Sequence, residues 1–193
     1  MTRRLHEWAF AGAGGLAALA MFSGAWAQTP QIDRRAATQR LLDALKSVPS
    51  ENTAALLEAH IEELWITEGT PAVRLLMSRG MRELKAGANA DAIEDFGDAI
   101  ILQPDLPEPW RARAQAKYAS GDVAGAVADL SQSVKREPRE FLAYRMLSDI
   151  AAERQDWKTA FEAWQQLIAI DPKTPGGDSR LKDLRRKALG EST

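Results

Sequence analysis

The sequence predicts an all-α protein, a solenoid of three helix pairs with flanking helices. Pro104, Pro138 and Pro172 lie 34 residues apart, and 34 residues is a length typical of a stacked helix–turn–helix unit. The residues between these prolines repeat in register. Residues 30–190 contain no alternating apolar and polar run bounded by turn residues, so no strand is expected there.

Each proline is taken as position 32 of a unit, which divides residues 73–174 into units 73–106, 107–140 and 141–174. Position 8 is small in every unit, as two closely crossing helices require: Gly80, Ala114 and Ser148. Position 20 on the second helix is always alanine: Ala92, Ala126 and Ala160. Position 24 is large and apolar: Phe96, Leu130 and Trp164. The phased small and large residues predict one buried seam inside each helix pair.

The turn inside each pair falls at position 15. Glycine suits a turn there because it adopts positive φ without a Cβ clash, and Gly87 and Gly121 supply it. The third unit has Gln155 instead. The proline that closes each unit cannot continue a helix, so it ends the pair.

These phased residues resemble the tetratricopeptide repeat family over residues 73–174, and the chain resembles a small exported bacterial member of it. The resemblance implies a right-handed superhelical α-solenoid whose first helices line a concave groove. The chain departs from the family pattern at position 7, where arginine replaces leucine at Arg79 and Arg113, and only the third unit keeps Leu147.

Residues 1–27 have the layout of a bacterial secretory signal. Arg3 and Arg4 precede an uncharged run from Ala9 to Ala27, and Ala25-Trp26-Ala27 offers a small-x-small cleavage site. We therefore expect cleavage after Ala27 and a periplasmic protein. The alternative is an uncleaved membrane anchor, because the uncharged run approaches the ~20 residues that span a bilayer.

Composition narrows the classes of function. The chain of 193 residues carries a net charge of −2, which gives no general attraction to nucleic acid or to anionic lipid. It contains no cysteine, so it has no disulfide and no thiol nucleophile. Its stability is expected to come from stacked helix faces.

Residues 28–72 are predicted to form a short leader and a helical hairpin, with helices at about 35–48 and 51–67 separated by Val48-Pro49-Ser50. This segment lacks the repeat's anchor residues, and we expect it to cover the exposed face of the first repeat. Residues 175–193 are predicted to form a C-terminal capping helix. The basic face of that helix is interpreted as solvated, with an electrostatic docking role as the alternative.

Candidate chemistry is sparse. His60 lies near Glu58, Glu62 and Glu63, but on a helix only Glu63 shares its face, and two ligands make a weak metal site. A serine nucleophile would have only His60 as its base once the signal is removed. The sequence shows no glycine-rich phosphate loop beyond the signal segment. We therefore expect no enzyme activity, no metal and no cofactor.

The family resemblance places partner-binding residues on the groove-facing positions of the first helices. They are Arg74, Met77, Met81, Arg111, Gln115, Tyr118, Arg145 and Asp149. Arginine and tyrosine suit interfaces, and methionine adapts its shape to a partner. We therefore expect a non-catalytic periplasmic scaffold that binds a peptide or protein, and no nucleic acid. One alternative is that the hairpin covers several of these residues. Another is a membrane-tethered structural or assembly component of the cell envelope, if the signal is retained.

Overall fold

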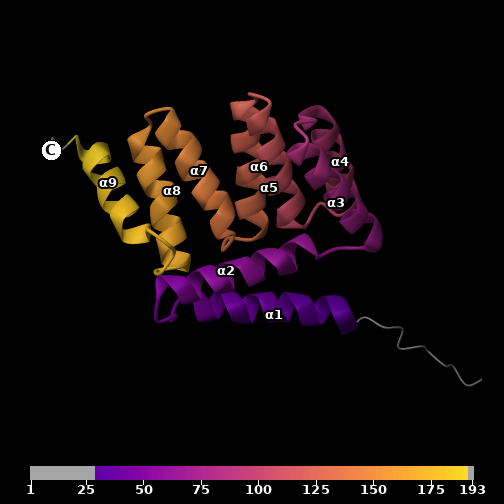
Figure 1. Ribbon diagram of the computed structural model, residues 1–193, viewed down its shortest axis with the longest axis horizontal. Coiled ribbons are helices and arrows are strands. Elements are labelled where there is room, and N and C mark those ends of the chain that lie inside the picture. The colour runs from indigo at the N-terminus through magenta and orange to yellow at the C-terminus, as the bar shows by residue number, and fades with distance from the viewer. Residues whose placement is uncertain (1–28, 191–193) are drawn as a thin grey trace, which may run out of the picture.

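The computed structural model describes residues 29–190, and every regular element in that range is an α-helix, as predicted (Figure 1). The predicted signal segment, residues 1–27, lies outside the described residues. The helices are α1 Thr29–Leu45, α2 Glu51–Ile66, α3 Pro71–Lys85, α4 Asn89–Leu102, α5 Pro107–Ala119, α6 Val123–Arg136, α7 Phe141–Glu153, α8 Trp157–Ile170 and α9 Gly177–Leu189. The pairs α3–α4, α5–α6 and α7–α8 stand side by side, and the prediction of an α-solenoid is confirmed.

Close helix crossings hold each pair together. A Cβ added to Gly80 would lie 2.7 Å from the ring of Phe96, so only glycine fits that crossing. The three alanines at position 20 are completely buried. In the third pair, the Ser148 hydroxyl donates a hydrogen bond to the Ala160 carbonyl at 2.9 Å, which satisfies the buried hydroxyl. The residues at positions 8, 20 and 24 therefore pack as their types predict.

The turns inside the three pairs share a left-handed backbone residue. Gly87 has φ +77°, Gly121 has φ +88°, and Gln155 has φ +61°. The third turn thus keeps the family geometry without glycine. A side chain in this region costs roughly 1–2 kcal/mol because its Cβ approaches the following carbonyl oxygen.

The departures from the family pattern at position 7 are explained by position 23. Arg113 donates to both carboxylate oxygens of Asp129, at 2.7 and 2.8 Å, and Arg79 pairs with Asp95 in the same way. Unit three has Leu147 and Ala163 at these two positions instead. Each unit therefore fills this space with either an ion pair or two apolar groups.

Asp129 is also held by Lys117, whose Nζ lies 2.8 Å from the carboxylate. Burial alone would raise the pKa of Asp129, but hydrogen bonds from Arg113 and Lys117 outweigh it and bring the pKa below its ordinary value. The carboxylate is thus kept charged inside the pair, with its hydrogen-bonding capacity used.

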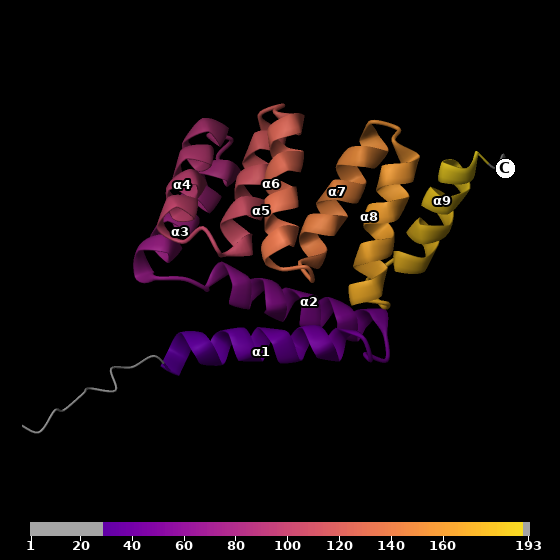
Figure 2. The ribbon, with the colours of Figure 1, turned by 180° about the vertical axis from the view of Figure 1, so that it is seen from behind.

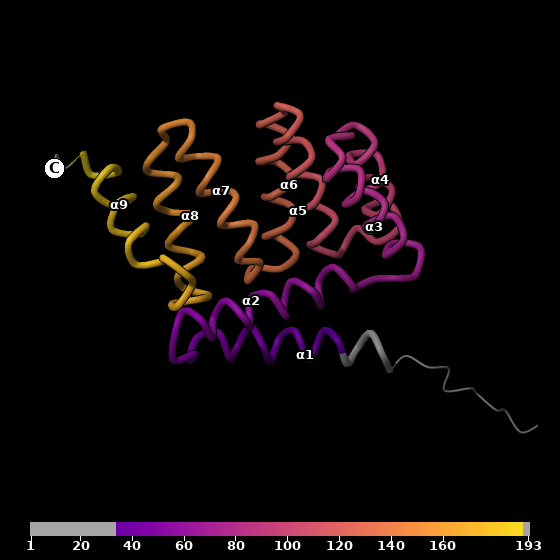
Figure 3. Tube along the Cα trace, in the orientation of Figure 1, coloured from indigo at the N-terminus to yellow at the C-terminus, as the bar shows by residue number. Residues whose placement is uncertain are grey.

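The N-terminal hairpin, α1 and α2, does not cover the face of the first repeat, so that expectation was wrong. Figures 2 and 3 show both helices running across the foot of the array, the end where the loops between units lie. The outward face of α3 carries Ser78 and Arg82 where α5 has the buried residues Ala112 and Ala116. Two polar side chains therefore stand on this face of the first repeat, beside Leu75, which is 68% exposed.

Apolar packing fixes the hairpin to the third unit. Leu42 and Leu45 of α1 are completely buried, and so is Ile61 of α2. The Trp65 ring lies 5.4 Å from the Phe141 ring, centroid to centroid. These residues share a core with Trp164, Leu167, Ile170 and Leu184. Fully burying a large apolar side chain is worth about 1.5–3 kcal/mol, so the hairpin is a strongly held part of the fold.

Polar contacts tie the same hairpin to the two loops that join the three units. Arg35 donates to Asp105 at 3.1 Å, and Gln39 donates to Glu137 at 2.9 Å. Arg139 donates to Asp43 at 2.5 Å. The hairpin therefore braces the three units against one another.

The last helix, α9, packs against α8 at the other end of the array. Leu184 is buried, and the Trp164 indole donates to the Gly177 carbonyl at 3.1 Å. Several cations of its basic face are paired: Arg186 and Lys187 with Asp183, and Arg180 with Asp149. Among residues 29–190, no helix is long and apolar enough to cross a membrane.

Candidate functional site

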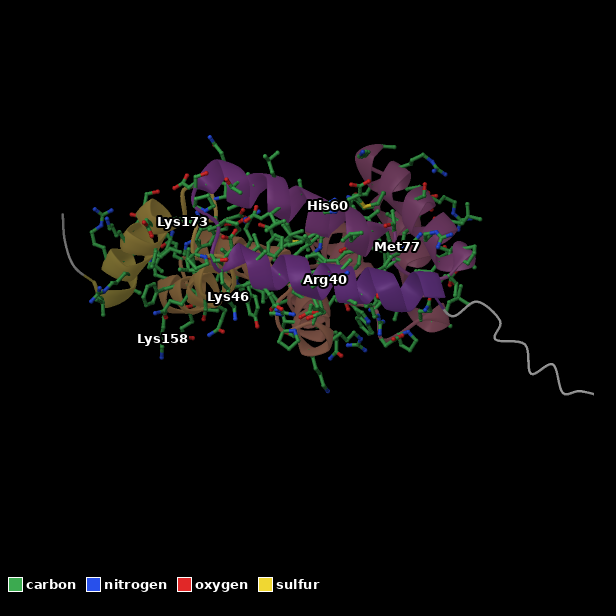
Figure 4. The ribbon with its side chains drawn as sticks, turned by 90° about the horizontal axis from the view of Figure 1, so that it is seen from below. Arg40, Lys46, His60, Met77, Lys158 and Lys173 are labelled. Carbon is green, nitrogen blue, oxygen red and sulfur yellow. The ribbon has the colours of Figure 1, made fainter. Side chains whose placement is uncertain are left out.

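The candidate groove runs along the first helices α3, α5 and α7, and the hairpin divides it into two halves. The lower half, positions 2 and 5, contains Arg74, Met77, Arg111 and Arg145. The upper half, positions 9 and 12, contains Met81, Gln115, Tyr118 and Asp149. Figure 4, seen from below, shows α1 and α2 spanning the foot of the array. Two of the predicted residues, Met77 and Arg111, are buried, at 2% and 7% exposure.

Arg111 lies at the centre of a cluster of three carboxyl groups. It donates to the buried Glu108 at 3.0 and 2.8 Å, and the partly exposed Glu62 of α2 lies 3.5 Å away. Its Nε is 3.3 Å from Glu140, which is fully buried at the start of α7. We name these four residues the Arg111 cluster.

Burial dominates the electrostatics of the Arg111 cluster. It raises the pKa of Glu140 to about 8, against the opposing effect of Arg111. Burial also raises the pKa of Glu108, where Arg111 again opposes it. One guanidinium cannot compensate two buried carboxylates and a third beside them, so a neutral carboxyl group is the stable form here.

Arg145 lies at the centre of a second cluster, one unit along. It donates to Glu58 of α2 at 2.8 Å and to the Thr174 hydroxyl at 2.8 Å, and Thr174 donates to Glu58 at 2.7 Å. Asp171 borders the same group, and burial together with the adjacent Glu58 raises its pKa to about 7. We name Glu58, Arg145, Asp171 and Thr174 the Arg145 cluster.

The upper half is more open. Gln115 is exposed, while Met81, Tyr118 and Asp149 are half-buried. The Tyr118 hydroxyl donates to Glu153, and that hydrogen bond raises the tyrosine pKa. Asp149 accepts from Arg180 at 2.5 Å. In the lower half, at the first-repeat end of the groove, Arg74 donates to the Gly69 carbonyl at 2.9 Å. This hydrogen bond uses part of the hydrogen-bonding capacity of its guanidinium.

A pocket of about 350 Å³ lies where the groove meets α9. Its lining joins two predicted residues, Arg145 and Asp149, to four that sequence reasoning missed: Glu58, Trp164, Pro175 and Arg180. The Arg180 guanidinium stacks 4.9 Å from the centre of the Trp164 ring. Arg180 lies outside the repeat, so no repeat position could have indicated it.

One signal in the sequence could have indicated the hairpin contacts. Glu58 and Glu62 are four residues apart and so share a face of α2. That face meets Arg145 and Arg111, which occupy equivalent positions in successive units. Two carboxylates on one helix face could have been matched to two arginines with the repeat spacing.

The one histidine of the described residues makes a single contact, at the surface of α2. His60 lies 3.7 Å from Glu63, and both side chains are more than half exposed. Across the described range, residues 29–190, no three metal-ligating side chains gather. The pocket beside α9, with its charged and aromatic walls, has the residue types found where protein surfaces contact one another.

A family model described as tetratricopeptide repeat matches residues 111–176. Tetratricopeptide repeat protein 36 of Homo sapiens is 32% identical over 148 residues, covering 66% of this chain and 78% of that protein. A TPR repeat-containing protein of Rhizobium etli is 24% identical over 154 residues, covering 80% of this chain and 76% of that protein. The chain belongs to the tetratricopeptide repeat family.

Solved structures share the fold. The TPR domain of Sgt2 from Aspergillus fumigatus aligns with a TM-score of 0.57 at 25% identity, covering 62% of this chain and 81% of that domain. The first TPR of Spaghetti (RPAP3), bound to the HSP90 peptide SRMEEVD, aligns with a TM-score of 0.57 at 19% identity, covering 64% of this chain and 97% of that one. MamA aligns with a TM-score of 0.53 at 19% identity, covering 82% and 84%.

Proposed function

We propose that this protein is a non-catalytic scaffold that binds a peptide or protein segment along the upper half of its groove. The observation that carries the proposal is the division of the groove by the hairpin. In the lower half, glutamates of α2 contact Arg111 and Arg145, while Met81, Gln115, Tyr118 and Asp149 border the part left open. The first TPR of Spaghetti (RPAP3) with its bound peptide supports peptide binding by this fold.

The hairpin changes how the proposal must be tested. Reversing the charge of Arg111 or Arg145 would place a further carboxylate among buried carboxyl groups, so lost binding would reflect lost folding. Gln115 and Tyr118 are better sites. Gln115 is exposed, and Tyr118 makes its hydrogen bond to a side chain that is itself exposed.

Site-specific photo-cross-linking in living cells tests the upper half. A photoreactive residue at Gln115 is expected to give discrete adducts, and Tyr118→Ala in the same chain is expected to remove them. The matched control is Lys158, an exposed residue of α8 that Figure 4 shows pointing outward. Equal adducts at positions 115 and 158, or adducts insensitive to Tyr118→Ala, would contradict the proposed surface.

We further propose that the protein acts in the bacterial periplasm after removal of residues 1–27. The charged start, the uncharged run and the small-x-small site support this. The first described helix begins at Thr29, so cleavage after Ala27 leaves the described helices intact. The intact mass of the exported protein decides between cleavage after Ala27 and a retained membrane anchor. A mass lacking residues 1–27 is expected, and a full-length, membrane-bound product would instead support a tethered envelope component.

A further inference from the structure

The interface between the hairpin and the array contains more carboxyl groups than cations. In the Arg111 cluster, Glu62, Glu108 and Glu140 face a single guanidinium. In the Arg145 cluster, Glu58 and Asp171 likewise share one. The remaining contacts of these carboxyl groups are neutral donors: the Thr174 hydroxyl and the backbone amides of Ala143 and Lys173.

One carboxylate oxygen in each cluster is buried without a hydrogen-bond donor. These atoms are Glu140 Oε1, which makes the 3.3 Å ion-pair contact with Arg111 Nε but no hydrogen bond, and Asp171 Oδ2. Both residues are completely buried. A buried, unsatisfied carboxylate oxygen is costly, whereas a protonated carboxyl group becomes a donor and loses its charge. Asp171 lies within hydrogen-bonding reach of Glu58, so one proton would link these two groups.

The hairpin contributes to both sites. Glu62 and Glu58 come from α2, and Trp65 of α2 packs on Phe141 directly after Glu140. Removing α2 would take one carboxylate out of each cluster and open the others to water. Protonation of these carboxyl groups is therefore favoured while the hairpin is docked, and less favoured once it is undocked.

We propose that docking of the α1–α2 hairpin takes up protons at these two clusters, so that the brace is tight in mildly acidic solution and loosens as the pH rises. The loosened state separates Arg111 and Arg145, in the lower groove half, from the α2 glutamates that contact them. The proposal does not depend on what the upper half of the groove binds.

The pKa values agree in direction with this geometry. Glu140 has a pKa of about 8 against an ordinary 4.5, and Asp171 has a pKa of about 7 against 3.8. A carboxyl group with a raised pKa stabilises the docked state fully below its ordinary pKa, and this contribution is lost as the pH rises through the raised value. The loosening therefore extends from about pH 4, near the ordinary pKa values, to about pH 8, the higher of the two raised values.

Hydrogen exchange of the whole protein at pH 6 and pH 8 tests the proposal. Protection factors, corrected for intrinsic chemistry, report local opening even where the open state is rare. Amides of α1 and α2 are expected to lose at least about tenfold in protection between the two pH values, since each linked proton contributes up to tenfold per pH unit. Amides in the middle of α6, away from the hairpin, are the internal reference.

Two neutral variants separate proton uptake from other effects of pH. Glu140→Gln and Asp171→Asn mimic the protonated groups and keep the acceptors for Ala143 and Lys173. The double variant is expected to keep α1 and α2 equally protected at pH 6 and pH 8. Glu63→Gln, an exposed carboxylate of α2, is the matched control and should retain the fall.

Two results would overturn the proposal: equal protection at both pH values in the unmodified protein, or an undiminished fall in the double variant. Each single variant is expected to remove part of the fall. The test therefore stands even if the double variant does not fold.

Discussion

The ion pair between Arg113 and Asp129 gives a prediction for which the chain supplies its own template. The third unit fills the same two positions with Leu147 and Ala163. Arg113→Leu with Asp129→Ala therefore transplants these two residues of the third unit into the second and leaves Lys117, whose side chain is 20% exposed, in place. We expect the double variant to fold with a free energy of unfolding within about 1 kcal/mol of the unmodified protein, because replacing a buried ion pair by apolar groups is often neutral.

The single variants should behave differently. Arg113→Leu leaves Asp129 buried with only Lys117 as its partner, and its expected cost of about 2–3 kcal/mol lies below the ~3–5 kcal/mol of a wholly unpaired buried charge. Asp129→Ala leaves a guanidinium whose side chain is 20% exposed and stacked on Trp110, so about 1–2 kcal/mol is expected.

Urea unfolding of the four proteins in this cycle measures the coupling free energy, expected at about 2 kcal/mol or more. The exposed pair Arg186–Asp183 serves as control, and its cycle should show no measurable coupling. If the double variant loses as much stability as the two single variants together, the claim that an apolar pair can replace this ion pair is wrong.

Three further predictions use the same unfolding assay. Gln155→Gly should raise the free energy of unfolding by up to about 1 kcal/mol, because it removes a side chain at φ +61°. A lower free energy of unfolding would instead show that the Gln155 side chain stabilises the turn. Trp65→Ala should cost about 3–5 kcal/mol and reduce the protection of α1, since Trp65 joins the hairpin to the third unit; a cost under 1 kcal/mol would show a weakly packed hairpin. The free energy of unfolding should fall from pH 6 to pH 9, because the raised pKa of Glu140 makes the folded protein bind an extra proton, and Glu140→Gln should flatten the fall; stability that rises over this range would contradict the burial of that carboxyl group.

The repeat units were predictable because their anchor residues do one physical job each time they occur. Gly80, Ala114 and Ser148 all lie where two helices cross, and the spacing of the prolines locates them without a structure. Even Gln155, which departs from glycine, occupies the turn that its position predicts.

The placement of the hairpin could not be predicted in the same way. Its helices carry apolar stripes, such as Leu42 with Leu45 and Ile61 with Trp65, that any neighbouring surface could bury. No repeat register fixes which surface that is. The decisive features are side-chain matches across distant segments, such as Asp43 with Arg139.

The sequence predicted which helices carry the candidate site, but it did not predict which of the site's residues are exposed. All eight predicted residues lie on the first helices, yet two of the three at position 5, Met77 and Arg111, are buried. Arg111 has the residue type of an interface anchor, and in this chain it is an internal one. Binding at the eight positions stays a prediction, now concentrated on the upper half.

The central claim is that the hairpin braces the foot of the array and leaves the upper groove half open. The chain has no cysteine, so pairs of introduced thiols can be joined without interference by a short bismaleimide cross-linker. Asp43→Cys with Arg139→Cys should cross-link rapidly within one molecule, because these side chains touch across 2.5 Å. Asp43→Cys with Ser78→Cys probes a hairpin lying on the outer face of the first repeat, and should not cross-link. Efficient cross-linking of the second pair and failure of the first would contradict the brace.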